Sequence, residues 1–280
     1  MHDNAKTAIS LRSNPRKMMI KQEILDVIGS NVDDAISKAH KILPNERIVR
    51  LCVENDIYWM RQYQPRQQID KSVTDVAGHS SMLRQKQKFE RLAARDVMLP
   101  RLVTFSDNYL VFVDYGLTLA DIVDNPAYSD KNRSDIFFKA GRELANLHVK
   151  GLFLKKGKAE DYSWDGKNII FTNFEEIFDK SDLLTHRMLN IWFFVHHAVY
   201  IALKRGVDIS DGLKSFMRGY TSSNEENAVR VVKYLTKFSR RRQWLVFLTF
   251  PIGYLKKIYR SDELKAIAPA LSFLSKHSTQ

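Results

Sequence analysis

Cysteine is almost absent from this chain of 280 residues, because Cys52 is the only one. A single cysteine cannot form an intrachain disulfide bond, which fits a reducing compartment. Long apolar runs are also missing. The two most apolar segments, 191–203 and 244–255, are shorter than the roughly 18 residues that a membrane-spanning helix needs. We interpret both as buried helices, and the polar N-terminus carries no visible secretory signal.

Several catalytic motifs are absent as well. The sequence contains no Gly-x-Ser-x-Gly, His-Glu-x-x-His or Cys-x-x-Cys pattern, so hydrolase, zinc-protease and thiol-redox functions lack support. His196 and His197 lie in an aromatic segment, and no third residue stands at the spacing of a metal ligand. We therefore expect these two histidines in the core.

Basic residues are in excess. The chain has 44 Lys and Arg against 32 Asp and Glu, which gives a formal net charge of +12. The basic residues gather at 12–21, 61–95 and 237–242, followed by Lys256, Lys257 and Arg260. Four interpretations stay open: a solvated basic face, an anionic membrane surface, a phosphate-bearing small substrate, and nucleic acid. Nucleic acid is the least supported, because no zinc-ligand spacing, RNA-binding aromatic motif or helix-turn-helix pattern accompanies the charge.

The first half of the chain predicts a small sheet with helices. Val49, Leu51 and Val53 alternate as in a strand, and Glu54-Asn55-Asp56 supplies a tight turn. The predicted elements are a helix at 32–42 stopped by Pro44, two strands within 48–63, a helix at 80–95, and strands at 97–105 and 109–115. Residues 17–29 fit either a helix or a strand.

The second half is predicted to be helical. Asp165-Gly166 signals a hairpin between short arms at 163–164 and 168–172. One predicted helix begins at residue 118. The others are predicted at 133–150, 182–204, 212–220, 225–237, 244–260 and 262–276. The prediction is an α+β chain with an N-terminal extension (1–45), a β-rich lobe (46–115) and a helical lobe (116–280).

This order resembles a protein-kinase-like fold. The segments LRQKQKFERLAARDVMLPRLVTF and DYSWDGKNIIFTNFEE are similar to parts of the bacterial lipopolysaccharide-core and Kdo sugar kinases, and the resemblance covers about residues 48–205. It implies two lobes, a small β-rich N-lobe with one helix and a larger helical C-lobe. It also implies ATP and Mg²⁺ as cofactors, and transfer of phosphate to a sugar or lipopolysaccharide-core substrate.

The resemblance assigns nucleotide-binding positions in the first lobe. Arg61 stands where these kinases carry a lysine that holds phosphates. Arginine can also pair with phosphate, but its planar guanidinium group differs in geometry from the compact charge of a lysine ammonium group. The partner glutamate on the following helix corresponds to Gln85 or Glu90. No glycine-rich loop precedes Ile48.

The resemblance also assigns catalytic and metal-binding positions. Lys156 stands where the catalytic aspartate is expected, and a lysine that stays cationic is a poor base for a hydroxyl. Asp161, predicted to be both catalytic and metal-binding, takes the place of a metal-binding asparagine. Asn173 takes the place of a metal-binding aspartate, with Glu175 as a substitute ligand. Asn190 stands where an aspartate accepts backbone N–H groups, and Asn can still accept one such bond.

Two main hypotheses follow. The first is an ATP-dependent kinase that works at the cytoplasmic face of the inner membrane, where the basic C-terminal stretch and residues 244–255 contact an anionic surface. The second is a pseudokinase, a binding or regulatory module without phosphotransfer, because Lys156, Asn173 and Asn190 replace three aspartates. The alternative for the hairpin motif is a turn with polar ends and no ligand.

Overall fold

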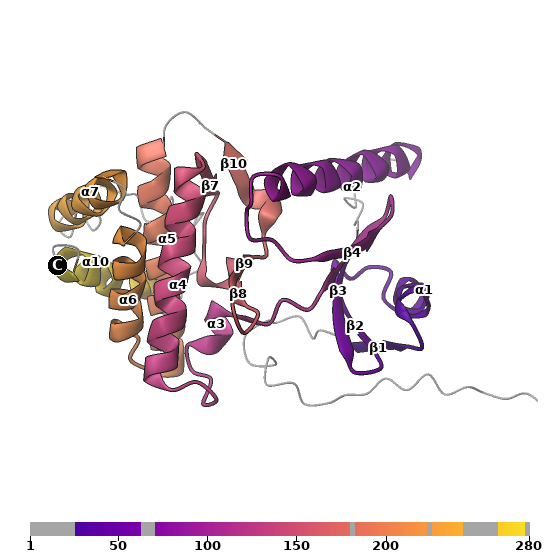
Figure 1. The fold of residues 1–280 in the computed structure, drawn as a ribbon, viewed down its shortest axis with the longest axis horizontal. Coiled ribbons are helices and arrows are strands. Elements are labelled where there is room, and N and C mark those ends of the chain that lie inside the picture. Colours follow the sequence, from indigo (N-terminus) through magenta and orange to yellow (C-terminus); the bar gives the residue numbers. More distant parts are fainter. Residues whose placement is uncertain (1–25, 63–70, 180–182, 223–225, 243–262, 278–280) are drawn as a thin grey trace, which may run out of the picture. The chain divides into compact units, whose positions relative to one another are not determined.

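The structure, a computed structural model, describes residues 26–62, 71–179, 183–222, 226–242 and 263–277. The chain divides into two units, 1–115 and 116–280. The first unit is built on a five-stranded sheet, and the second is mainly helical with a two-stranded and a three-stranded sheet (Figure 1). The predicted α+β class is confirmed.

The sheet of the first unit has the strand order β1-β2-β3-β5-β4. Its strands are β1 (Asp26–Gly29), β2 (Ile48–Val53), β3 (Asp56–Gln62), β4 (Leu102–Phe105) and β5 (Tyr109–Val113). The predicted hairpin within 48–63 is confirmed, with Val53 paired to Asp56 across a turn in which Glu54 has a left-handed φ of 53°. The strand predicted at 97–105 is shorter, because Pro100 has no backbone N–H to donate to a neighbouring strand.

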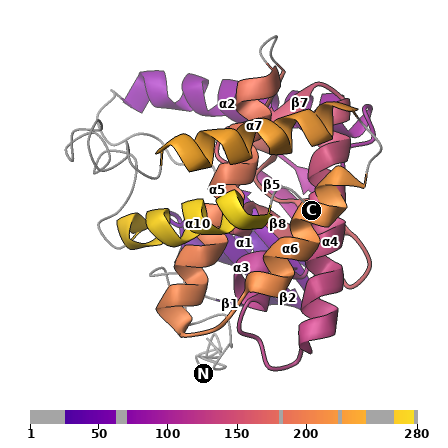
Figure 2. The ribbon, with the colours of Figure 1, turned by 90° about the vertical axis from the view of Figure 1, so that its left-hand side faces the viewer.

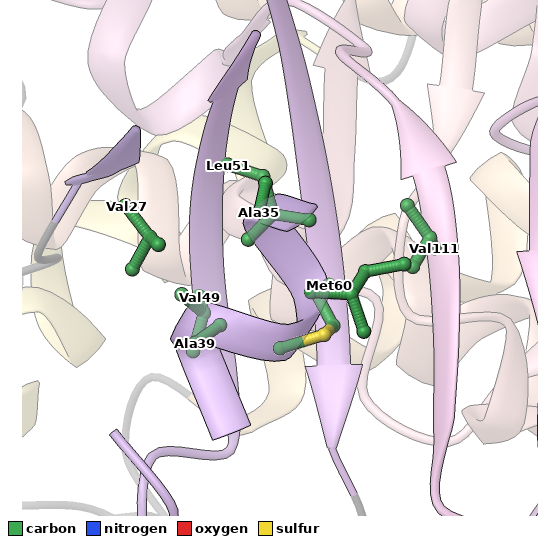
Figure 3. Close-up of a cluster of buried hydrophobic side chains, with 8 residues drawn as sticks. Val27, Ala35, Ala39, Val49, Leu51, Met60 and Val111 are labelled. Atoms are coloured by element: carbon green, nitrogen blue, oxygen red, sulfur yellow. The ribbon is translucent and has the colours of Figure 1, made fainter. Parts of the chain in front are cut away.

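Helix α1 (Val32–Ile42) covers one face of this sheet and has the predicted bounds. Asn31 caps it by accepting a hydrogen bond from the Asp34 N–H at 2.9 Å. Figure 3 shows the apolar cluster between helix and strands, formed by Val27, Ala35, Ile36, Ala39, Val49, Leu51, Met60 and Val111. Burial of these side chains fastens α1 to the sheet.

Strand β1 and helix α1 lie within the range 1–45 that the sequence analysis set apart as an extension. In the structure β1 pairs in parallel with β2, and Val27 contributes to the same apolar cluster as Val49 and Leu51. A strand was one of the two alternatives for residues 17–29, and a four-residue strand that pairs in parallel has too little local alternation to decide between them.

Helix α2 (Lys71–Ala93) packs against the opposite sheet face through Phe89, whose ring centroid lies 5.8 Å from that of Phe112. Strand pairing puts Trp59 opposite Phe112, and Arg61 opposite Leu110. Arg61 therefore belongs to the α2 side of the sheet. The helix begins at Lys71, earlier than the predicted residue 80. The prediction missed its first turns because residues 71–79 lack a regular apolar repeat.

The second unit begins with short elements around a hairpin. They are β6 (Leu117–Thr118), α3 (Leu119–Ile122), β7 (Leu152–Leu154), β8 (Tyr162–Trp164), β9 (Ile169–Phe171), β10 (Ile177–Asp179) and the 3₁₀ turns η2 (Ala159–Asp161) and η3 (Phe174–Glu176). The hairpin predicted at Asp165-Gly166 is confirmed between β8 and β9. Its turn is held by Asp165 Oδ1, which accepts hydrogen bonds from the N–H groups of Lys167 (2.8 Å) and Asn168 (2.6 Å).

The longer helices of this unit largely follow the prediction. They are α4 (Asp130–Val149), α5 (Leu183–Arg205), α6 (Ser210–Thr221), α7 (Glu226–Arg242) and α10 (Ile267–His277), with η4 (Glu263–Ala266) before the last. The helix predicted at 244–260 lies outside the described residues. Within the described ranges, no helix combines the length and apolarity needed to cross a bilayer.

Helices α4 and α6 lie side by side at very short distance (Figure 2). A Cβ atom added to Gly141 of α4 would lie 1.9 Å from the Phe216 carbonyl oxygen. A Cβ atom added to Gly219 of α6 would lie 1.9 Å from the Phe138 carbonyl oxygen. Each helix thus supplies a glycine where the other's backbone passes, and this contact needs both.

We expect Gly219→Ala to destabilise the protein by about 2 kcal/mol or more, because the added methyl group forces the two backbones apart. Gly212→Ala in the same helix is the matched control. Its Cβ would lie 3.5 Å from the Phe137 ring, an ordinary contact, so helix propensity can raise stability by up to about 1 kcal/mol. Urea unfolding of both variants measures the difference, and equal losses would contradict the close crossing.

Candidate functional site

The candidate site lies in the second unit, around residues 155–161, which join β7 to β8 and are called here the Asp161 loop. Asn190 of α5 is buried and holds the residue that precedes this loop. Its Oδ1 accepts a hydrogen bond from the Leu154 N–H at 3.0 Å, and its Nδ2 donates to the Leu154 carbonyl oxygen. The backbone N–H bond predicted for Asn190 is confirmed.

His148 and Tyr220 extend this contact through the core. His148 Nε2 lies 3.1 Å from Asn190 Oδ1, and His148 Nδ1 lies 2.8 Å from the Tyr220 hydroxyl. The amide oxygen of Asn190 can only accept, so Nε2 carries the proton and Nδ1 accepts from Tyr220. Burial lowers the pKa of His148 to about 3, and the nearby Arg187 charge adds to this. The histidine is therefore a neutral link at physiological pH.

Asp161 ends the loop with a buried carboxylate that is only 7% exposed. Its Oδ2 accepts a hydrogen bond from the Lys158 N–H at 2.7 Å, and its Oδ1 accepts from Asn173 Nδ2 at 3.2 Å. The Asp161 carbonyl oxygen accepts from the Thr172 N–H at 3.0 Å. Through these bonds Asp161 joins the loop to the end of β9, and Asp161 and Asn173 are brought together.

The electrostatic surroundings of Asp161 disfavour its charge. The pKa of its carboxyl is raised from 3.8 to about 7, mainly by burial and also by the Glu160 and Glu176 carboxylates, although the bonds from Lys158 and Asn173 act in the opposite direction. Asp161 therefore exchanges its proton near neutral pH. A buried carboxylate in this state favours a nearby cation or a proton transfer.

The ionisable neighbours of Asp161 include groups that were not predicted for the site. Lys158 Nζ and His197 Nε2 each lie 4.0 Å from a carboxylate oxygen of Glu160. His197 is buried, as predicted, and burial lowers its pKa to about 3. Lys158 and Glu160 could have been noticed as ionisable groups beside Asp161 in the sequence, whereas His197 reaches them only through the packing of α5.

The other predicted residues of the second unit are more exposed than Asp161. The Lys156 side chain is exposed on the Asp161 loop, and Glu175 is partly exposed in η3. The charge of Glu176, the next residue, raises the Asp161 pKa together with that of Glu160. Over the described ranges, no group of three or more His, Cys, Asp and Glu side chains is arranged to hold a metal ion. Asp161 and Asn173 carry side-chain oxygens of the kind that magnesium prefers, and the metal-binding and catalytic roles of Asp161, Asn173, Lys156 and Glu175 all stay predictions.

In the first unit, the geometry distinguishes Gln85 from Glu90. Gln85 lies one helical turn before Phe89 and so faces the sheet, and its buried Oε1 has no hydrogen-bond partner among the described residues. The Glu90 side chain is 57% exposed and lies 3.4 Å from Lys86 Nζ. Gln85 therefore shares the α2 side of the sheet with Arg61, and the nucleotide-binding roles of all three residues stay predictions.

Comparison with known proteins gives distant similarity only. No family model matches the chain. An uncharacterised protein of Haemophilus influenzae is 24% identical over 227 residues, which cover 79% of this chain and 90% of that protein. A solved structure of the bifunctional kinase-methyltransferase WbdD superposes with a TM-score of 0.38 at 12% identity, over 68% of this chain and 47% of WbdD. A second WbdD structure gives the same TM-score over 49% of its length. The chain thus spans about half of these solved proteins.

We expect Asp161→Asn to gain stability relative to the wild type as pH rises from about 4 to 7. The Asp161 pKa is raised in the folded state, so its stabilising proton is fully bound below about 4 and is lost as pH rises through 7. Asn is neutral throughout and keeps an acceptor for Lys158. The relative gain is up to about 4 kcal/mol for a shift of about three pKa units, measured by urea unfolding at several pH values.

Asp135→Asn is the control, since it removes the same formal charge from an exposed position of α4. If both variants follow the same pH dependence, the buried carboxyl of Asp161 does not titrate as described.

Proposed function

We propose that the chain is a kinase-like protein that uses Mg²⁺ and ATP to phosphorylate a hydroxyl group of a sugar, with a lipopolysaccharide-core sugar as the favoured substrate. The observation that carries this proposal is Asp161, a buried carboxyl with a pKa of about 7 beside an asparagine amide, at the end of a braced loop. The motif resemblance of residues 48–205 supports the same reaction.

The residues around Asp161 fit a metal–nucleotide complex in their chemistry. Magnesium prefers oxygen ligands and uses one or two protein carboxylates together with phosphates and water. Asp161 offers one carboxylate, and Asn173 keeps its amide oxygen for a ligand while its Nδ2 donates to Asp161. The raised Asp161 pKa is expected where a buried carboxylate lacks a compensating cation. Arg61 and Gln85 are the residues that we propose for nucleotide binding in the first unit.

Asp161 is also the group best suited to handle the proton of the acceptor. Bound Mg²⁺-ATP supplies the phosphoryl group and the positive charge that neutralises its oxygens. The acceptor hydroxyl loses one proton as its oxygen forms the new bond to phosphorus and ADP leaves. The ionised Asp161 carboxylate can accept that proton, whereas the exposed cation of Lys156 is a poor acceptor.

A specific contact favours a second candidate function, a pseudokinase that binds without phosphotransfer. Both Asp161 carboxylate oxygens already accept hydrogen bonds, from Lys158 and Asn173. Asn173 is a neutral amide where the resembled kinases carry an aspartate. A carboxylate held in this way can brace the hairpin without holding a metal ion.

We expect the full-length protein to bind Mg²⁺-ATP with release of a proton near pH 7, because a bound cation favours the ionised form of Asp161. Isothermal titration calorimetry in buffers of different ionisation enthalpy measures this release. Asp161→Asn removes the release and weakens binding about 10-fold or more, as expected for loss of a charged contact. Asp135→Asn retains both.

Phosphotransfer then separates the two candidates. Transfer of labelled γ-phosphate to core oligosaccharide, lost in Asp161→Asn, supports the enzyme. Nucleotide binding without transfer to any sugar acceptor supports the binding module. Absence of nucleotide binding at millimolar concentration, with or without Mg²⁺, overturns both.

A further inference from the structure

Helix α7 separates its described side chains into two faces. The buried face consists of Ala228, Val231, Val232, Leu235 and Thr236. The exposed face, called here the outer face of α7, consists of Val229, Arg230, Lys233, Tyr234 and Lys237. This spacing is that of one helical stripe, so the outer residues form a row of about 12 Å at 1.5 Å per residue.

The outer face combines positive charge with exposed apolar surface. It has three cations and no carboxylate, and Val229 and Tyr234 are 56% and 47% exposed. The chain of α7 also continues into the run Arg240-Arg241-Arg242. Single exposed apolar side chains are common, but here two of them lie in the same row as three cations.

The outer face of α7 points toward solvent. Within the second unit the helix packs against α5 and α10, and Figure 2 shows it crossing in front of α5 at the outside of the helical unit. The buried Thr236 hydroxyl donates to the Val232 carbonyl oxygen of the same helix at 2.8 Å, so the inner side of α7 can pack in the core although it carries a polar group.

We propose that the outer face of α7 docks on an anionic lipid surface. Lysine and arginine attract phosphate headgroups, while their long stems let the charges stay at the interface as the apolar residues enter it. Tyrosine is suited to the level of the headgroups, and a valine gains by contact with acyl chains. Nucleic acid offers the same phosphate charge but no surface for Val229, so lipid accounts for both halves of the face.

This proposal does not depend on phosphotransfer, although it would place a kinase beside a membrane-bound sugar. The test therefore uses the full-length protein without nucleotide, in co-sedimentation with vesicles of phosphatidylglycerol and phosphatidylcholine. We expect binding to the anionic vesicles, weakened by salt, and none to pure phosphatidylcholine. Failure here leaves the proposed phosphotransfer intact, since that reaction is measured on a soluble oligosaccharide.

The decisive variant is the triple substitution Arg230→Gln, Lys233→Gln and Lys237→Gln. Each basic residue near the membrane contributes about five-fold to affinity, so we expect a loss of about 100-fold. The matched control replaces three exposed basic residues elsewhere in the unit, Lys131, Arg142 and Lys167, with glutamine. This control loses the same charge and retains most of the binding.

Tyr234→Ser tests the apolar part, and we expect a several-fold loss of vesicle binding that persists at high salt, where the charges are screened. Circular dichroism checks that each variant is folded, and the single substitutions replace the triple one if it is not. Equal losses in both triple variants, or no vesicle binding by the wild type, would overturn the proposal. So would binding of single-stranded RNA through Arg230, Lys233 and Lys237 in place of vesicles.

Discussion

The contact on which the candidate site depends is the pairing of the Asn190 side chain with both backbone groups of Leu154. One amide satisfies a buried N–H and a buried carbonyl group, and its oxygen also accepts from His148. Loss of such a side chain would leave several buried polar groups without partners, each costing about 1–3 kcal/mol. The bond thus fixes where β7 ends and where the Asp161 loop begins.

This fixed start explains the state of Asp161. A loop that could move would let its carboxylate reach water, but here Asp161 is held inside by Lys158 and Asn173. Burial then raises the pKa of Asp161 to near neutral pH, where the carboxyl can bind a cation or exchange a proton. The stability of the loop and the chemistry of the carboxyl are therefore two consequences of the same packing of α4, α5 and α6.

Local patterns predicted the parts of this structure that local forces determine. The bounds of α1 follow from apolar spacing and the Pro44 stop, and the turns after Val53 and at Asp165-Gly166 follow from turn chemistry. The sequence left a helix and a strand open for residues 17–29, where β1 lies, and it did not predict β7 and β10, because three or four residues paired with distant segments carry little periodicity. At the site, Asn190 and Asp161 were found by resemblance. Tyr220 was not found, since its bond to His148 joins distant segments, and only burial separated Gln85 from Glu90.

The most direct test of this account is the protonation state of His148, observed by nitrogen-15 NMR from neutral pH down to pH 4. The Asn190 bond predicts a neutral ring with its proton on Nε2 throughout, and loss of that signature in Asn190→Ala. An imidazole that titrates near pH 6.5, or that carries its proton on Nδ1, would contradict the hydrogen-bonded network and with it the anchoring of the Asp161 loop.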